Sequence, residues 1–171
     1  SNAFKARHCV DGGRLDSLLK QRAAGEGGGD FASAVACNLL IKMLLADAAV
    51  RDRNLTKADV PNAYPQGKRL AGRPKTYMQL PTAFRSMRGD SGEELCIEME
   101  TPMWGETQAG YEWQLELERK LTAIGWRRAE GVPALWIFSS PEGECRLVTV
   151  VDDLLFSESK SSGYSIADRT V

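Results

Sequence analysis

The chain has 171 residues, of which 43% are hydrophobic and 26% are charged, a composition typical of one globular domain with a substantial core. Its net charge of −1 argues against a protein that holds nucleic acid by overall positive charge, although a local basic channel is compatible with a neutral chain. The longest apolar stretch, residues 39–50, is interrupted by Lys42 and Asp47, which excludes a membrane-spanning helix there.

The first three residues and the cysteines bear on processing and compartment. Residues 1–3 have the composition of a scar left by tag removal and are set aside from the fold. The four cysteines are widely spaced without a C-x-x-C pair, and His8 is the only histidine, so His8 with Cys9 is a poor candidate for a structural zinc site. No secretory signal is visible, and we expect reduced, mostly buried thiols in an intracellular protein that is not secreted.

The N-terminal part predicts a glycine-rich loop followed by a long helix. Residues 25–29 lack a dinucleotide-binding fingerprint, because Asp30 stands where the third glycine would be. From Asp30 onward apolar residues recur at helical spacing, and Asp30 or Ser33 would cap a helix that ends near residues 52–54. The apolar positions that set this period are Phe31, Val35, Leu39, Met43 and Leu44.

Short strands alternate with loops in the middle of the chain. Residues 55–60 predict a strand that stops at Pro61, which has no N–H to donate to a ladder. Further strands are expected at residues 77–80, closed by Pro81, and at residues 96–99. A basic loop at residues 67–74 and a glycine-containing loop at residues 88–94 separate them.

The C-terminal part predicts a helix followed by a β-hairpin. The helix covers residues 108–124 and ends at Gly125. Apolar runs at residues 134–138, 146–151 and 154–156 then read as strands, with a turn at residues 141–143. Helices together with antiparallel hairpins predict an α+β domain in which an antiparallel sheet packs on helices.

We expect Asp152 and Asp153 to occupy the tip of a tight turn between two apolar strands. Adjacent carboxylates repel each other, and either a divalent cation or an exposed hairpin turn, where aspartate is also favoured, would accommodate them. Asp59, at the end of another predicted strand, favours the cation. If the strands are neighbours in one sheet, Asp59 and Asp152 can face a common metal site suited to phosphoryl transfer.

Six segments resemble motifs of copia-type retrotransposon reverse transcriptases, in that family's order and spacing. D-V-P-N-A-Y at residues 59–64 resembles the first catalytic motif L-D-V-x-x-A-F, and V-V-D-D at 150–153 resembles Y-V-D-D. M-W-G-E-T-Q-A at 103–109 resembles L-Y-G-L-K-Q-A, and Y-M-Q-L-P at 77–81 with Phe84 resembles Y-M-x-x-P…F. K-A-R at 5–7 resembles the fingers strand K-A-R-L-V, and residues 39–49 resemble the segment I-R-x-L-L-A-L-A-A.

The resemblance implies a polymerase of palm-and-fingers type. Residues 4–171 would be a partial reverse transcriptase domain, truncated before the thumb, with fingers at about 4–54 and 65–102, palm elements at about 55–64 and 103–159, and a tail at 160–171. The implied activity of the family is RNA-directed DNA polymerisation with Mg²⁺, or Mn²⁺, as cofactor. We expect this fragment to be inactive alone, because without a thumb it would hold its duplex poorly. The partners would be an RNA or DNA template-primer and deoxynucleoside triphosphates, in a cytoplasmic particle or the nucleus and without a membrane.

The resemblance also assigns roles to single residues. Asp59 and Asp152 would ligate the metals, the carbonyl of Val60 would reach one of them, and Asp153 would be a third catalytic carboxylate with a weaker role. The substrate-contacting residues fall into two groups: Lys5, Arg7, Tyr64 and Gln108 would contact the incoming nucleotide, with Tyr64 as a steric gate against ribose, and Trp104, Gly105 and Val150 would face the template-primer.

Several residues depart from the family pattern, and these departures support an alternative function. Acidic or neutral side chains near a phosphate backbone weaken nucleic-acid binding, so the alternative is an inactive, decayed or truncated remnant acting at most as a binding or assembly module. Another phosphoryl transfer at the same carboxylates is a third interpretation. Apolar faces left open by the truncation would favour a homodimer. The departures are Glu98, Glu100, Thr107, Gly110, Tyr111 and Val150.

Overall fold

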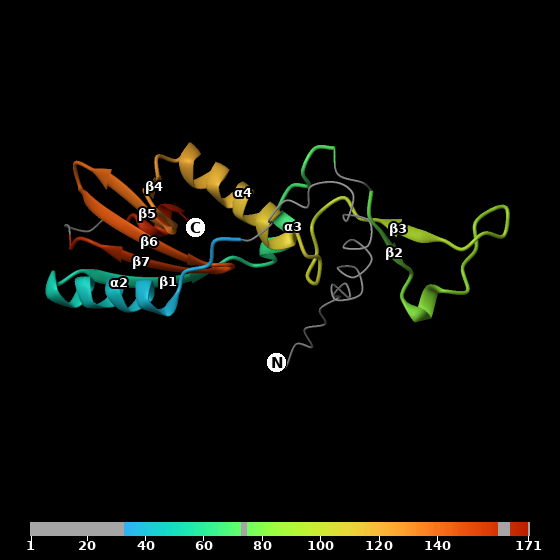
Figure 1. Ribbon diagram of the computed structural model, residues 1–171, viewed down its shortest axis with the longest axis horizontal. Helices are drawn as coiled ribbons and strands as arrows, with labels where there is room; N and C mark the ends of the chain where they lie inside the picture. The colour runs from blue at the N-terminus through green and yellow to red at the C-terminus, as the bar shows by residue number, and fades with distance from the viewer. Residues whose placement is uncertain (1–32, 73–74, 161–164, 171) are drawn as a thin grey trace.

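A five-stranded antiparallel sheet forms the centre of the domain (Figure 1). The computed structural model describes residues 33–72, 75–160 and 165–170. The strand order is β1-β7-β6-β5-β4, so the first strand in sequence lies at one edge and pairs with the last. The strands are β1 (Asn54–Asp59), β4 (Arg127–Ala129), β5 (Val132–Ser140), β6 (Gly143–Val150) and β7 (Asp153–Glu158).

Two helices cover opposite faces of this sheet (Figure 1). Helix α4 (Ala109–Ala123) packs through Trp113 against Leu154 and the other residues of the larger core cluster. Helix α2 (Asn38–Val50) packs through Leu44 against Leu155 on the other face. The neighbours Leu154 and Leu155 serve different clusters because side chains alternate along a strand. The predicted α+β class, with an antiparallel sheet packed on helices, is confirmed.

The chain returns to the core after β7. Glu158, which is 6% exposed, accepts a hydrogen bond from the backbone N–H of Ile166 at 2.9 Å through its Oε2 atom. The same oxygen accepts the N–H of Ala167 at 3.4 Å, at the start of the short helix α5 (Ala167–Thr170). Ile166 and Ala167 are buried in the larger core cluster, so part of the predicted tail packs as an integral piece of the domain.

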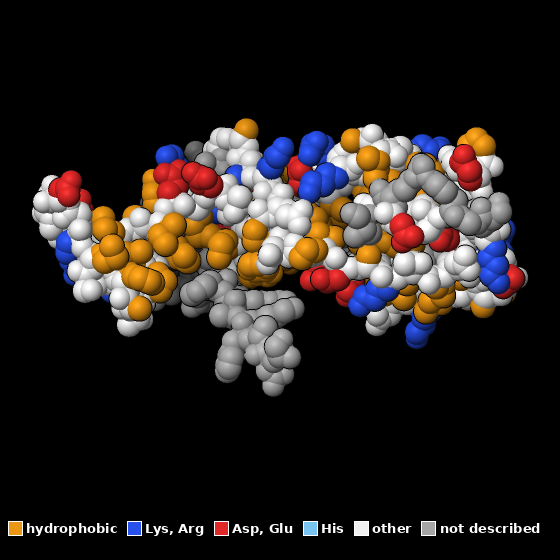
Figure 2. Space-filling model, turned by 180° about the vertical axis from the view of Figure 1, so that it is seen from behind, with side chains coloured by type: hydrophobic (Ala, Val, Ile, Leu, Met, Phe, Trp, Pro, Cys, Tyr) orange, Lys and Arg blue, Asp and Glu red, His pale blue; other side chains and the backbone are white. Residues whose placement is uncertain are grey.

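A separate two-stranded sheet projects away from the main body (Figure 1). Strands β2 (Tyr77–Gln79) and β3 (Cys96–Glu98) pair antiparallel, and a short 3₁₀ helix, η1 (Thr82–Phe84), follows β2. Figure 2 shows hydrophobic side chains gathered over this hairpin. The exposed apolar residues here are Tyr77, Phe84, Met87, Leu95 and Ile97.

The sequence predicted which long helices and strands form more accurately than the residues at which they begin and end. Helix α2 begins at Asn38, so the predicted start at residue 30 or 33 is wrong for the described part of that stretch. The backbone N–H of Ala36 donates to Thr149 O at 3.3 Å, and that of Ala34 donates to the Gln114 side chain. These partners lie on the sheet and on α4, so tertiary hydrogen bonds hold the segment before α2, and its residues 33–37 are not helical.

Several short elements, among them α3 and β4, and the environments of two cysteines were not foreseen. Helix α3 (Ala63–Gln66) and the charged strand β4 carry no clear apolar period, which is why the sequence did not reveal them. The expectation of mostly buried thiols is wrong for Cys37 and Cys96, which are exposed, and holds for Cys145. Among the described helices, none is both long enough and apolar enough to cross a bilayer.

Candidate active site at the acidic turn

Strand register brings the predicted carboxylates to one end of the sheet. Asp59, the last residue of β1, lies directly opposite Asp153, the first residue of β7. Val150 at the end of β6 also pairs with Asp153, so Val151 and Asp152 form the two-residue turn between β6 and β7. The backbone N–H of Val60 donates to Asp152 O at 2.9 Å and ties the end of β1 to this turn. Residues nearly a hundred positions apart in sequence therefore meet at one end of the sheet.

The turn adopts an uncommon backbone conformation that helix α4 supports. Val151 has φ of 56°, in the left-handed region that β-branched residues rarely occupy. Trp113 is 2% exposed and donates a hydrogen bond from its indole Nε1 to Val151 O at 2.8 Å. This bond satisfies the carbonyl and fixes the turn to the core. Strained residues held by their surroundings are frequent at functional sites.

Lys57 pairs with one of the three carboxylates, Asp153. Its Nζ atom is 2.9 Å from Asp153 Oδ1, and it lies two residues before Asp59 on the same face of β1. The pKa of the Lys57 ammonium is raised above its usual value, first by the hydrogen bond to Asp153 and by the charge of that residue. The charges of Asp59 and Asp152 raise this pKa further, by smaller amounts. Lys57 therefore compensates part of the negative charge of the turn.

Tyr64 and Trp104 lie beside the turn. Burial raises the pKa of the Tyr64 phenol, and the charge of Asp152 raises it further. The Tyr64 and Trp104 rings are tilted to each other with centroids 6.3 Å apart. A Cβ atom built on Gly110 would lie 3.9 Å from the Tyr64 hydroxyl, which locates this hydroxyl near the first turn of α4. The two predicted substrate-contacting aromatic residues are thus neighbours, and Tyr64 is the one near Asp152.

A buried ion pair positions the loop that carries Trp104 and Gly105. The Arg69 guanidinium donates to Glu106 Oε1 at 3.0 Å, and the Glu106 side chain is fully buried. The same guanidinium donates to Met99 O at 2.6 Å and to Thr101 O at 3.1 Å. Glu106 also accepts the N–H of Met103 at 2.9 Å. In this loop the buried Glu106 carboxylate is therefore paired with Arg69, and the backbone groups of Met99, Thr101 and Met103 have hydrogen-bond partners.

The oxygen atoms of these three carboxylates are suitable ligands for a hard divalent cation. Asp59 is exposed, Asp152 and Asp153 are partly exposed, and carboxylate oxygens are preferred ligands of Mg²⁺. No group of three histidine, cysteine, aspartate or glutamate side chains in the described residues has the geometry of a metal site. Mg²⁺ is commonly held by one or two carboxylates together with substrate phosphates and water, and the two predicted ligands Asp59 and Asp152 fit that pattern.

The site predicted from the sequence is assembled only in part. Asp59, Val60, Val150, Asp152 and Asp153 come together at the turn, with Tyr64 and Trp104 nearby. Gln108 lies at the N-cap of α4, where its carbonyl accepts the N–H of Glu112, and Gly105 has φ of 91° in the adjoining loop. Lys5 and Arg7, like His8 and Cys9, lie outside the described residues.

Sequence reasoning missed two residues that shape the turn. Lys57 could have been found from its spacing, since residues two apart on a strand share a face. Trp113 could not, because its partner is a backbone carbonyl 38 positions away, and the helical pattern alone gives it a core role.

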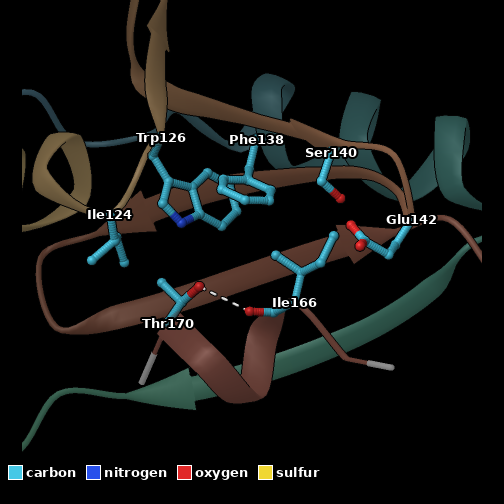
Figure 3. A pocket seen from close by; sticks show the side chains of 7 residues that line it. All are labelled: Ile124, Trp126, Phe138, Ser140, Glu142, Ile166 and Thr170. Atoms are coloured by element: carbon cyan, nitrogen blue, oxygen red, sulfur yellow. Dashed lines mark hydrogen bonds between the residues drawn. The ribbon is translucent and has the colours of Figure 1, made fainter. Parts of the chain in front are cut away.

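A cavity of about 300 Å³ lies elsewhere, between the C-terminal end of α4, strand β5 and helix α5 (Figure 3). The Trp126 and Phe138 rings lie together on one side of it, and their centroids are 5.6 Å apart. Ser140 and Glu142 line one end of the cavity. None of the carboxylates of the acidic turn lines this cavity, so it is separate from the candidate active site.

The structure is thus an α+β domain in which Asp59, Asp152 and Asp153 lie at one end of an antiparallel sheet. The family model described as reverse transcriptase (RNA-dependent DNA polymerase) matches residues 2–167, and the chain belongs to that family. No curated protein and no solved structure gives a significant match to the chain.

Proposed function

We propose that this chain is the fingers-and-palm part of a copia-type reverse transcriptase that extends a primer 3′-hydroxyl by nucleotidyl transfer. The observation that carries the proposal is the register of β1 and β7, which sets Asp59 opposite Asp153 and beside the turn residue Asp152. The six motifs identified in the sequence and the family membership support the same assignment.

The acidic turn would hold the cofactor. Asp59, Asp152 and the carbonyl of Val60 would bind Mg²⁺, or Mn²⁺, together with the phosphates of an incoming deoxynucleoside triphosphate. The bound metal would stabilise charge on the attacking and leaving oxygens of an in-line displacement. Asp153 would not be a main metal ligand, because its Oδ1 atom forms an ion pair with the Lys57 ammonium.

The protein groups around the turn would act by positioning. Tyr64, half-buried next to Asp152, would limit the room beside the nucleotide sugar and act as a gate against ribose. Trp104, beside Tyr64, would face the nascent base pair. Gln108, at the start of α4, would contact the nucleotide. Orientation of this kind and fixed electrostatics supply most of the rate enhancement in phosphoryl transfer.

Calorimetric titration with Mn²⁺ tests the proposed site. We expect the chain to bind Mn²⁺ and the Asp59→Asn, Asp152→Asn double variant not to bind it. A Glu93→Gln, Glu94→Gln double variant, altered at two exposed acids of the β2–β3 loop, is the matched control and should bind as the wild type does. Binding that survives in the Asp59→Asn, Asp152→Asn variant would contradict the assignment of these ligands.

An inactive remnant that binds protein is the second candidate, and the β2–β3 hairpin favours it. Residues 75–100 carry three basic and five acidic side chains, and the Lys75 ammonium is 2.8 Å from Glu98 Oε1. A surface of this charge repels a phosphate backbone. Fluorescence anisotropy with a labelled primer-template at low salt separates the candidates. A working palm-and-fingers unit should bind the duplex with an affinity that falls steeply with salt, and a remnant should not bind it.

A further inference from the structure

We propose that Lys57 is a built-in counter-cation of the acidic turn, which a divalent metal must displace in order to bind. The inference rests on the proposed function, since it concerns the same carboxylates. It adds a residue that sets the metal affinity of this chain.

The first support is geometric. Lys57 and Asp59 point to one face of β1, and Asp153 is directly opposite Asp59 on β7. Lys57 is therefore diagonal to Asp153, a separation that long side chains span across antiparallel strands. The observed distance of 2.9 Å from Lys57 Nζ to Asp153 Oδ1 shows that this lysine turns toward the carboxylates along its own strand.

The second support is the location of Lys57 on an edge strand. β1 is the outermost strand of the sheet, and lysines on edge strands commonly point to solvent, where they discourage pairing with other chains. The Lys57 side chain is 67% exposed, so solvent is available to it, yet it lies against a carboxylate that is 48% exposed. The fixed ammonium charge and a divalent cation would compete for the same negative field, because like charges near one site oppose each other.

The consequence for metal binding follows from charge alone. With Lys57 in place, the three carboxylates at this end of the sheet present a net charge of about −2, and without it about −3. The first cation to bind must move the ammonium away from the carboxylates. Lys57 thus disfavours metal in the free protein, and a nucleotide arriving with its own metal would bind without depending on a preloaded site.

The experiment is calorimetric titration of the full chain with MnCl₂, comparing the wild type with Lys57→Gln and Lys57→Arg. We expect Lys57→Gln to bind Mn²⁺ about two- to fivefold more tightly than the wild type, and Lys57→Arg to match the wild type because it keeps the charge. Lys42→Gln, which removes the same charge from an exposed position on α2, is the matched control and should leave the affinity unchanged.

A second readout follows the lysine directly. Brief acetylation with acetic anhydride and mass spectrometry should show Lys57 labelled more slowly than Lys42, and Mn²⁺ should raise the labelling of Lys57 alone. Equal Mn²⁺ affinities of the wild type and Lys57→Gln, including an absence of binding by both, would overturn the proposal.

The variants also separate this inference from the proposed function. Equal and measurable binding by the wild type and Lys57→Gln, lost in Asp59→Asn, Asp152→Asn, would leave the metal site standing and remove the role of Lys57. Tighter binding by Lys57→Gln that vanishes in Lys57→Gln, Asp59→Asn, Asp152→Asn would support both. Tighter binding that persists in this triple variant would place the metal elsewhere and overturn both.

Discussion

The indole Nε1 of Trp113 donates a hydrogen bond to the carbonyl oxygen of Val151, 2.8 Å away. Trp113 belongs to the second turn of α4 and is buried in the larger core cluster, whereas Val151 is the first residue of the acidic turn. Helix α4 therefore determines where the carbonyl of the turn points. Through it, the core of the domain fixes the backbone that carries Asp152.

Replacement of this tryptophan should lower both stability and metal binding. In Trp113→Phe the Val151 carbonyl loses its partner, and a hydrogen bond left unmade in a partly buried site costs about 1–3 kcal/mol. Chemical denaturation measures the loss, and Mn²⁺ calorimetry measures the effect on the turn. Trp126→Phe, on the same side of the sheet but packed on Phe138 and Phe156, should lower stability without weakening Mn²⁺ binding.

The left-handed conformation of Val151 predicts an asymmetry between two neighbouring valines. Val151 has φ of 56°, a conformation that costs about 1–2 kcal/mol for a residue with a Cβ atom and nothing for glycine. Val150, in strand β6, has no such strain to relieve. Denaturant unfolding should therefore show Val151→Gly to be less destabilising than Val150→Gly by about 1–2 kcal/mol. Equal losses would contradict the assigned conformation.

The pair of Arg69 and Glu106 should behave as one unit. Glu106 stands where the family motif L-Y-G-L-K-Q-A has leucine, and its buried carboxylate is held by Arg69 at 3.0 Å. Glu106→Leu alone should cost about 3–5 kcal/mol, because it leaves the Arg69 charge buried without this partner. The Arg69→Met, Glu106→Leu double variant should recover most of that loss. A double-mutant cycle by urea unfolding gives the coupling energy, and additive losses would contradict the pairing.

Cys145 predicts a pH dependence at the alkaline end. Burial raises the pKa of its thiol from 9.0 to about 12, with the charge of Glu158 as a further cause. The folded state keeps the thiol neutral while the unfolded state ionises it above about pH 9, so stability is complete below that pH and falls toward pH 12. Unfolding measured between pH 8 and pH 11 should show a smaller decline in Cys145→Ala.

The same burial protects Cys145 from alkylation. At pH 8 iodoacetamide should modify the exposed Cys37 and Cys96 and leave Cys145 unmodified until the protein unfolds. Mass spectrometry of the digested protein resolves the three sites.

The sequence predicted those parts of the molecule that depend on local pattern. The strand ending near Asp59, the helix ending before Gly125 and the hairpin around Asp152 follow from periodicity and turn residues, and all three are present. The pairing of β1 with β7 was a conditional prediction, because side-chain alternation defines a face and leaves the neighbour open. Asp59 lies opposite Asp153 because of the register between β1 and β7, and this register is known only from the assembled sheet.

Other features depend on contacts between distant residues. The start of α2 was misplaced because the N–H groups of Ala34 and Ala36 bind Gln114 and Thr149, partners far along the chain. The short strand β4 carries Arg127 and Arg128, and it is held by its pairing with β5 rather than by β propensity. The ion pair of Arg69 and Glu106 joins two loops whose proximity is a result of folding.

The hydrogen bonds that Glu158 accepts from the N–H groups of Ile166 and Ala167 have a practical consequence for handling the protein. Glu158 ends the strand that Asp153 begins, and the five residue steps between them span roughly 17 Å. A tether or fluorescent label attached after α5 would therefore leave the domain at the end of the sheet remote from the acidic turn. Immobilised in this way on a sensor surface, the chain would present Asp59, Asp152 and Lys57 to dissolved nucleotides and metals.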